Sequence, residues 1–390
     1  MAFSDEDFSI YLHIPFCQIK CSYCAFNTYV HLEGWIEPFI DALIQEIKWI
    51  GNSRPEHPVK TVYFGGGTPS LLGAEQVGAI LKAISDTFLL MPGCEISLEA
   101  NPGDVTSDYL IALKSLGINR LSIGMQSANR DELELFSRRH SYDDVVEAVN
   151  AAREAGIDNV NLDLIYGFPH QTEHAWRRSL EQLLALNPEH VSLYALGLED
   201  GTALQTWVRN GRLPAPDDDL AADMYEMADA LLSAGGYEQY EISNWSKVGY
   251  ECRHNLQYWH NLPYPGFGPG AHGYAGGVRY WTILSPLKYV KALRAHSPPL
   301  VFPRTPATDQ AVVVDRETEI AETLLMGLRL TRDGVQRAAF RERFGADLLD
   351  LRGDLLKRHE DDGLLTIDPE RVRLTRRGRL LSNVVFRDLV

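Results

Sequence analysis

Three of the five cysteines of this chain, Cys17, Cys21 and Cys24, lie within the eight residues CQIKCSYC. Thiolates are soft ligands that suit iron–sulfur clusters and zinc, and a loop with this spacing can place three of them around one metal centre. Three protein ligands leave a coordination position open, which is typical of a reactive site. The spacing therefore predicts a reactive metal centre. Two alternatives are a zinc site completed by His13 and unrelated buried thiols.

The composition limits where such a site would work. Among 390 residues, 37 are Lys or Arg and 53 are Asp or Glu, so the net charge is −16 and nucleic acid is not an expected partner. No apolar run approaches the roughly 20 residues of a membrane span, and the acidic N-terminus MAFSDEDFSI does not resemble a signal peptide. An odd number of clustered cysteines argues against a disulfide framework. We therefore expect a cytoplasmic protein.

The elements that would position the cysteines alternate between two periodicities. Stretches with the two-residue alternation of β-strands are separated by apolar helical stripes, which predicts βαβ units and a parallel sheet. The expected strands are FSIYLHI, VKTVYF, EISLEAN, RLSIGMQ, VNLDLIYG and HVSLYAL, and the expected helices lie near 35–50, 75–89, 106–116, 142–155 and 172–186. Six strands by residue 196 predict an α/β fold, a partial TIM-type (β/α)6 barrel of parallel strands over 1–235, with a cluster loop at 15–30.

The rhythm changes after the sixth strand. A helix is expected near 219–234, and residues 236–300, which contain HNLQYW, are rich in aromatic residues and glycine, so this segment is expected to pack on the barrel. Beyond the linker HSPPLVFPRTPATD, residues 308–390 combine helices with a two-stranded ribbon, as in a smaller winged-helix-like α+β domain. Such modules can bind DNA, but the acidic chain favours a packing or docking role.

Polar residues collect where the predicted strands end. GGGTPS follows the second strand, Glu99 and Gln126 end the third and fourth, and Asp163 lies in the fifth. The carboxyl ends of parallel barrel strands share one face, where active sites are built. A phosphate-binding loop is disfavoured because no Gly-Lys-Ser/Thr follows the glycines. Taken singly, Glu99 or Asp163 would also suit a structural carboxylate.

The stretch CQIKCSYC resembles the three-cysteine signature of the radical S-adenosylmethionine enzymes. YLHIPFC, GGGTPS, SLEANP, GMQS and NLDLIYGFP are similar to the oxygen-independent coproporphyrinogen III oxidase subgroup, and the resemblance runs from about residue 8 to the end. It implies that Cys17, Cys21 and Cys24 hold a 4Fe–4S cluster whose fourth iron chelates the methionine part of S-adenosylmethionine. Reduction of the cluster would split this cofactor into methionine and a 5′-deoxyadenosyl radical.

The resemblance also implies roles for other residues. Tyr11 and Tyr23 would neighbour the cluster and cofactor. The methionine part would meet Gly66, Gly67 and Thr68, since glycine lets backbone carbonyls approach an ammonium group. The cofactor's amino-acid and ribose groups would contact Glu99, Gln126, Arg138 and Asp163, and the Asp163 carboxylate suits ribose hydroxyls.

Two departures from the oxidases resemble a sister group of heme chaperones. The oxidases carry a fourth cysteine where this chain has Phe26, and they carry a longer arm before the cluster motif. The chaperones also share a His-Asn-x-x-Tyr-Trp motif, and the stretch CRHNLQYW supplies it with His254, Asn255, Tyr258 and Trp259. An imidazole beside aromatic rings suits ligation of heme iron. Cys252 is a rival ligand, and His254 would also suit a structural role at a turn.

The sequence therefore favours a heme chaperone that carries heme as cargo, with a 4Fe–4S cluster and S-adenosylmethionine, and hands heme to a recipient hemoprotein. The alternative is a radical enzyme that decarboxylates the propionates of coproporphyrinogen III to vinyl groups. An electron carrier is a third hypothesis, but it needs no nucleoside site. A homodimer is left open. His254 is expected to act independently of the cluster and cofactor site, because that site is built from other loops.

Overall fold

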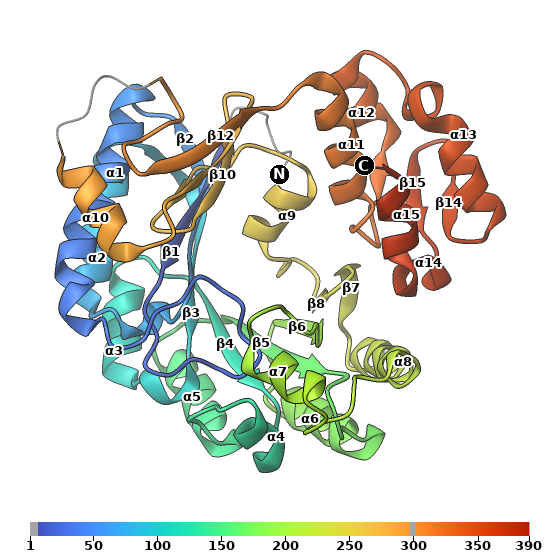
Figure 1. The fold of residues 1–390 in the computed structure, drawn as a ribbon, viewed down its shortest axis with the longest axis horizontal. Helices are drawn as coiled ribbons and strands as arrows, with labels where there is room; N and C mark the ends of the chain where they lie inside the picture. Colours follow the sequence, from blue (N-terminus) through green and yellow to red (C-terminus); the bar gives the residue numbers. More distant parts are fainter. Residues whose placement is uncertain (1–6, 296–300, 390) are drawn as a thin grey trace.

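Six parallel strands and the helices that connect them form a curved α/β layer (Figure 1). The computed structural model describes residues 7–295 and 301–389, and the parts of the predicted segments at 1–6, 296–300 and 390 lie outside the described residues. The strands are β1 (Phe8–Ile14), β2 (Pro58–Gly66), β3 (Leu89–Ala100), β4 (Arg120–Gln126), β5 (Asn159–Tyr166) and β6 (His190–Ala195). The connecting helices are α1 (Ile36–Ser53), α2 (Ala74–Ser85), α3 (Ser107–Ser115), α4 (Arg130–Leu135), α5 (Tyr142–Glu154) and α6 (Glu173–Ala185).

The sheet is open rather than closed. Each strand from β1 to β6 pairs in parallel with the next in sequence. The outer edge of β6 is met by the antiparallel strand β8 (Asn244–Ser246), and the outer edge of β1 is met by β9 (Gly266–Phe267). Strands β1 and β6 therefore do not pair with each other. This confirms the expected α/β fold with a mostly parallel central sheet.

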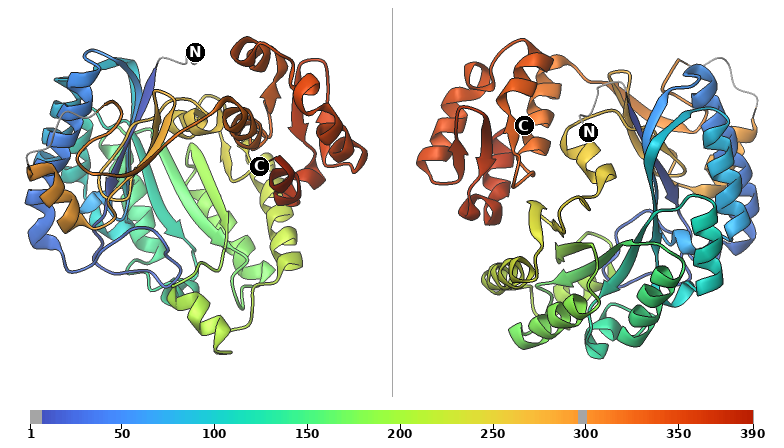
Figure 2. Two further views of the ribbon diagram at one scale, coloured as in Figure 1. Left: turned by 45° about the horizontal axis from the view of Figure 1, so that its top comes forward. Right: turned by 180° about the vertical axis from the view of Figure 1, so that it is seen from behind.

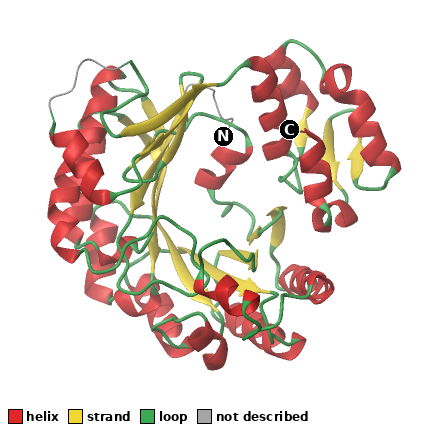
Figure 3. Ribbon diagram, in the orientation of Figure 1, coloured by secondary structure: helices red, strands yellow, loops and turns green. Residues whose placement is uncertain are grey.

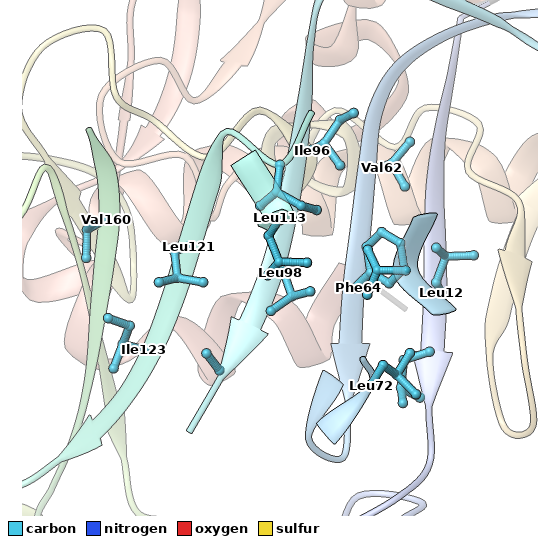
Figure 4. Close-up of a cluster of buried hydrophobic side chains, with 14 of the residues drawn as sticks. Leu12, Val62, Phe64, Leu72, Ile96, Leu98, Leu113, Leu121, Ile123 and Val160 are labelled. Atoms are coloured by element: carbon cyan, nitrogen blue, oxygen red, sulfur yellow. The ribbon is translucent and has the colours of Figure 1, made fainter. Parts of the chain in front are cut away.

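The hydrophobic core lies between the sheet and its helices (Figure 4). Leu12 on β1, Phe64 on β2 and Leu98 on β3 point into this layer, and Leu113 of α3 packs against the same cluster. Successive side chains of a strand point to opposite faces, so the residues next to these, such as Glu99, face the interior of the curved sheet. The helix layer is apolar and the interior face is polar.

The segment after β6 supplies the strands that cover the two edges of the sheet. It contains α7 (Ala203–Arg209), α8 (Asp218–Ala234), β7 (Glu238–Glu241), α9 (Arg253–Trp259), α10 (Pro286–Arg294) and a second sheet of β10 (His272–Ala275), β11 (Val278–Thr282) and β12 (Thr308–Val313). Helix α9, which carries the HNLQYW stretch, lies between the sheet and the C-terminal unit in both views (Figures 1 and 2). The short helices α4 and α7 are not among the elements expected from the sequence.

The C-terminal unit has its own core and a small antiparallel sheet (Figure 3). Its elements are α11 (Arg316–Gly327), β13 (Val335–Gln336), α12 (Arg337–Phe344), α13 (Leu348–Asp361), β14 (Leu365–Ile367), β15 (Arg371–Leu374), α14 (Arg376–Leu380) and α15 (Ser382–Leu389). The expected ribbon is β14 and β15, and β13 adds a third strand beside β15. Among the helices of the described residues, none is both long and apolar enough to cross a membrane.

A buried carboxylate fastens the late segments to the first helix. Glu46 of α1 accepts hydrogen bonds from the backbone amide of Gly268 (2.9 Å), the hydroxyl of Tyr289 (2.7 Å) and the hydroxyl of Thr305 (2.8 Å). Burial raises the pKa of Glu46 to about 6. Each donor comes from a different part of the chain beyond residue 260, so this one side chain holds three segments together.

Replacing Glu46 with alanine should lower the free energy of unfolding by roughly 2–4 kcal/mol, because three buried donors lose their acceptor. Chemical denaturation under anaerobic conditions would measure this. Glu46→Gln should cost less, since the Thr305 hydroxyl can turn to accept from the amide.

A comparison of wild type with Glu46→Gln at several pH values tests the pKa of Glu46. A pKa raised from 4.5 to about 6 by folding gives a stabilising contribution that is full below about 4.5 and is lost as pH rises through 6. Wild type should therefore lose stability relative to Glu46→Gln between pH 4.5 and 7. A difference that does not change with pH would contradict the raised pKa.

Candidate cluster and cofactor site

A cavity of about 640 Å³ opens at the carboxyl ends of the parallel strands, under the loop between β1 and α1. It is lined by the three clustered cysteines and by most of the other residues predicted from the sequence, namely Tyr23, Gly66, Gly67, Thr68, Glu99, Gln126, Arg138 and Asp163. Tyr11 and His254 are not among the lining residues. The fold thus brings together predicted residues from the four strands β2 to β5 and from the loops that follow the strands, although they are separated by up to 146 positions in the chain.

The cysteine loop is closed at its neck, so its thiols project into the cavity. The amide of Cys17 donates to the carbonyl of Tyr29 (2.9 Å), and the amide of Tyr29 donates to the carbonyl of Pro15 (2.8 Å). The hydroxyl of Thr68 donates to the Cys17 sulfur at 3.4 Å, and Nη1 of Arg138 donates to the Cys21 sulfur at 3.5 Å. None of the five cysteines forms a disulfide.

This donor set fits a 4Fe–4S cluster. Burial raises the pKa of Cys17 and of Cys24, so these thiols need a positive partner to ionise, and cluster iron would supply it. Within residues 7–295 and 301–389, no three His, Cys, Asp or Glu side chains are placed to hold a single metal ion. A cubane cluster does not require that arrangement, because each thiolate binds a different iron.

The structure argues against a zinc site in which His13 is the fourth ligand. The Nδ1 atom of His13 is 3.0 Å from the Tyr11 hydroxyl, and its Nε2 atom is 3.0 Å from the carbonyl oxygen of Asn27. Both ring nitrogens are therefore engaged away from the thiols. The imidazole instead ties β1 to the far side of the cysteine loop.

The glycines at the end of β2 are required because neighbouring parts of the chain approach them closely. Gly67 passes beneath this loop, and a Cβ atom there would lie 2.6 Å from the carbonyl oxygen of Phe16 and 3.1 Å from the Cys17 sulfur. Gly66 has φ +109°, and a Cβ atom there would lie 2.7 Å from the His13 ring. A side chain at Gly67 would therefore displace the cysteine loop, and one at Gly66 would collide with the His13 ring.

Two carboxylates face the cavity from the interior side of the sheet. Glu99 accepts from the Tyr63 hydroxyl (2.8 Å) and from the Gly66 amide (3.1 Å). Burial raises the pKa of Glu99 to about 7, although these two hydrogen bonds lower it. Burial also raises the pKa of Asp163, which accepts from Nδ2 of Asn161 at 2.7 Å. A cationic ligand beside these two carboxyl groups would favour their charged form and lower their pKa values.

Gln126 and Arg138 reach the cavity through local departures from regular structure. Gln126 has φ +63°, a left-handed conformation that costs a non-glycine residue on the order of 1 kcal/mol, and the pairing of β4 with β5 shifts register just before it. Arg138 follows α4 and is fixed by the carbonyl of Gly124 (3.1 Å) and by the Asn101 side chain. Asn101 lines the cavity but was not predicted, although it stands two residues after Glu99.

Two other predicted residues lie behind the cavity wall or at its side. Tyr11 is half-buried and does not line the cavity; its ring stacks on that of Tyr63 with centroids 6.4 Å apart, and burial raises its pKa far above the usual range. Tyr23 lines the cavity and packs edge-on against Phe136 at 5.0 Å.

The imidazole of His254 is enclosed in the protein interior. Its side chain is 1% exposed, its Nδ1 atom is 2.6 Å from the Thr61 hydroxyl, and its Nε2 atom is 2.7 Å from the Tyr258 hydroxyl. Burial lowers the pKa of His254 to about 3. Cys252 is 0% exposed and donates to Glu95. Neither group can reach an iron atom without a rearrangement of α9.

Comparison with known proteins gives the relatives of this chain. Residues 11–183 match the Radical SAM superfamily, and residues 314–381 match the HemN C-terminal domain. "Heme chaperone HemW" of Mycobacterium tuberculosis is 40% identical over 99% of this chain and 95% of that protein. The protein of the same description in Bacillus subtilis is 38% identical over 97% of this chain and 98% of that one.

The solved structure of coproporphyrinogen III oxidase (HemN) from Escherichia coli superposes with a TM-score of 0.84. It covers 98% of this chain and 90% of that chain at 24% identity. The likeness shows a common fold for the whole chain, C-terminal unit included.

Replacing any one of Cys17, Cys21 or Cys24 with alanine should abolish the brown colour and iron content of anaerobically reconstituted protein, because each thiolate would hold one iron. The control is Cys94→Ala, since Cys94 is buried in the hydrophobic core away from the cavity. Iron and sulfide analysis would measure about four of each in wild type and in the control. Zinc without iron in the reconstituted wild type would contradict the assignment.

Binding of S-adenosylmethionine should release a proton from Glu99. With a pKa of about 7, roughly half of the carboxyl groups are protonated at pH 7, and a cation beside them favours the charged form. Calorimetry in buffers of different ionisation enthalpy should show about half a proton more released by wild type than by Glu99→Gln. The excess should vanish above pH 8.5.

Glu199→Gln is the matched control, because Glu199 is an exposed carboxylate that lines the same cavity. It should release as many protons as wild type. Protons lost by the ligand's own amine are common to all three proteins and cancel. Equal release from wild type and Glu99→Gln would show that the cation does not sit beside Glu99.

Proposed function

The chain belongs to the heme chaperone HemW family of the radical S-adenosylmethionine superfamily, and from this premise we propose that it binds heme and delivers it to a recipient hemoprotein. The observation that carries the proposal is the near-complete alignment with HemW proteins at 40% identity. Membership of the superfamily implies a 4Fe–4S cluster and S-adenosylmethionine. Five unpaired cysteines suit a reducing compartment, so we place the protein in the cytoplasm.

We assign the cluster to Cys17, Cys21 and Cys24 and the S-adenosylmethionine to the cavity beside them. Once bound, the cluster would supply the electron for cofactor cleavage. The protein's own contribution is positional and electrostatic. Arg138 and Thr68 donate hydrogen bonds to two of the sulfurs and so favour their thiolate form. The carboxylates of Glu99 and Asp163 would hold the ammonium and ribose groups of the cofactor.

We propose that heme is held at the mouth of this cavity, on Ile19, Lys20 and Phe26 of the cysteine loop. Ile19 is 47% exposed and Phe26 is 67% exposed, although both line the cavity. Large exposed apolar side chains grouped at a cavity mouth suit a flat apolar ligand. The exposed Lys20 would offer an ammonium group to a propionate. Phe26 stands where the oxidases carry a cysteine, so the same position separates the two hypotheses.

His254 remains the rival site for heme. To ligate iron, its imidazole would have to give up the hydrogen bonds to Thr61 and Tyr258 and become accessible. The rim formed by Ile19, Lys20 and Phe26 requires no such change. This difference in accessibility favours the rim.

Heme-loaded, reconstituted protein should pass heme to apomyoglobin, observed as a shift of the Soret band to that of myoglobin. It should form no vinyl product from coproporphyrinogen III under anaerobic, reducing conditions with S-adenosylmethionine. Phe26→Ser should weaken heme binding roughly ten- to a hundredfold, because burying a phenylalanine contributes about 1.5–3 kcal/mol. Its iron content should stay that of wild type.

Val313→Ser is the control for Phe26→Ser, since Val313 is 72% exposed on β12, outside the cavity. It should bind heme as wild type does. Formation of protoporphyrinogen IX would replace the chaperone proposal with the oxidase. Wild-type heme affinity in Phe26→Ser, together with loss of binding in His254→Ala, would move the heme site to α9.

A further inference from the structure

We propose that Tyr63 is a positioning residue for the cofactor cavity and that the imidazole of His254 holds Tyr63 in place, so that helix α9 and the cavity are linked. The proposal rests on the assignment of Glu99 to the S-adenosylmethionine site made above, and it is independent of where heme binds.

Tyr63 sets the direction of the Glu99 carboxylate from behind the cavity wall. Its hydroxyl donates to Oε1 of Glu99 at 2.8 Å, while Oε2 accepts from the Gly66 amide at 3.1 Å. Tyr63 is not itself a lining residue of the cavity. Both carboxylate oxygens are therefore oriented by β2, and one of the two donors is a side chain that does not line the cavity.

The other side of Tyr63 is occupied by His254. The two rings stack with centroids 4.9 Å apart and an angle of 24° between their planes. Nδ1 of His254 is 2.6 Å from the hydroxyl of Thr61, two residues before Tyr63 on β2, so both contacts lie on one face of the strand. The imidazole is thus fixed against the same strand that carries the phenol.

Helix α9 is fastened to the neighbouring strand by a second carboxylate. Glu95 on β3 accepts from the amides of Arg253 and His254, at 3.1 Å each, and from the Cys252 thiol at 3.7 Å. Glu95 and Glu99 are four residues apart on β3 and therefore face the same side. One carboxylate holds the start of α9, the other faces the cofactor cavity, and Tyr63 with His254 fills the space between them.

Displacement of His254 would leave a void on one face of Tyr63. In a close-packed interior the atoms lining a void lose contacts, so the phenol would gain freedom and its hydrogen bond to Glu99 would weaken. By linkage, a ligand that fixes Glu99 would in turn favour the seated position of α9. The sequence predicts that His254 acts independently of the cofactor site, whereas this proposal links the two through one side chain.

The titration of Glu99 reports this linkage. Burial raises the pKa of Glu99, and the Tyr63 hydrogen bond opposes that rise. The other charged or titratable groups around Glu99 are Asp163, Arg120, Tyr11, Tyr194 and Tyr258. A change at Tyr63 or His254 removes none of these groups, although the rings of Tyr11 and Tyr258 also contact the His254 ring.

The test is a titration of the Glu99 carboxyl by ¹³C NMR in reconstituted protein without S-adenosylmethionine, followed by calorimetry with it. Tyr63→Phe should raise the pKa of Glu99 by about 1 and weaken S-adenosylmethionine binding at pH 7 roughly five- to tenfold. His254→Ala should shift both quantities in the same direction by less. His254→Phe, which restores a ring against Tyr63, should return both toward wild type.

Tyr258→Phe is the matched control, because it removes a buried hydroxyl from His254 without removing the ring stacked on Tyr63. It should shift the Glu99 titration by less than His254→Ala does, because the stacked ring remains. An unchanged Glu99 titration in Tyr63→Phe, or in folded His254→Ala of wild-type iron content, would overturn the proposal. A shifted titration with unchanged S-adenosylmethionine affinity would support the linkage and instead contradict the assignment of Glu99 to the cofactor.

Discussion

Side-chain alternation along six parallel strands is the constraint on which the rest of this structure depends. Each strand has to satisfy two environments at once, a helix layer that excludes water and an interior that does not. On β2, Phe64 enters the helix layer and Tyr63 the interior, and on β3 the same division separates Leu98 from Glu99. A shift of one residue in any strand would exchange these sets. The polar side chains of the site therefore lie on the strand face opposite the hydrophobic core.

The polar side chains on the interior face of the sheet cost free energy to bury, and this cost explains their shifted pKa values. The pKa values of Glu99 and Asp163 are both raised because the folded protein removes water from them, and the nearby hydrogen-bond donors and the Arg120 charge offset this only in part. In the same cavity, two thiols are held in their neutral form by burial. A site of this kind is completed by positive charge, which a cluster and a sulfonium ligand would both bring.

Two buried carboxylates that accept backbone hydrogen bonds help attach the later segments. Glu46 accepts from Gly268, and Glu95 accepts from Arg253 and His254. Such contacts fix the course of the chain at a point, and they do so across more than 150 residues of sequence separation. The aromatic and glycine-rich segment is therefore part of the barrel's architecture as much as a cover for it.

The sequence by itself determined the local features. Cysteine spacing, strand periodicity and the polar residues at strand ends depend on neighbours within a few positions, so the fold class, the cysteine loop and the residues around Glu99 and Asp163 could be predicted. Only the tertiary structure decided which side chains are accessible. His254 and Cys252 carry groups suited to binding iron, yet each is engaged by a partner more than 150 residues away in the sequence. Whether a ligating group meets solvent or a buried hydroxyl is set by packing between segments, and a motif of a few residues does not contain that information.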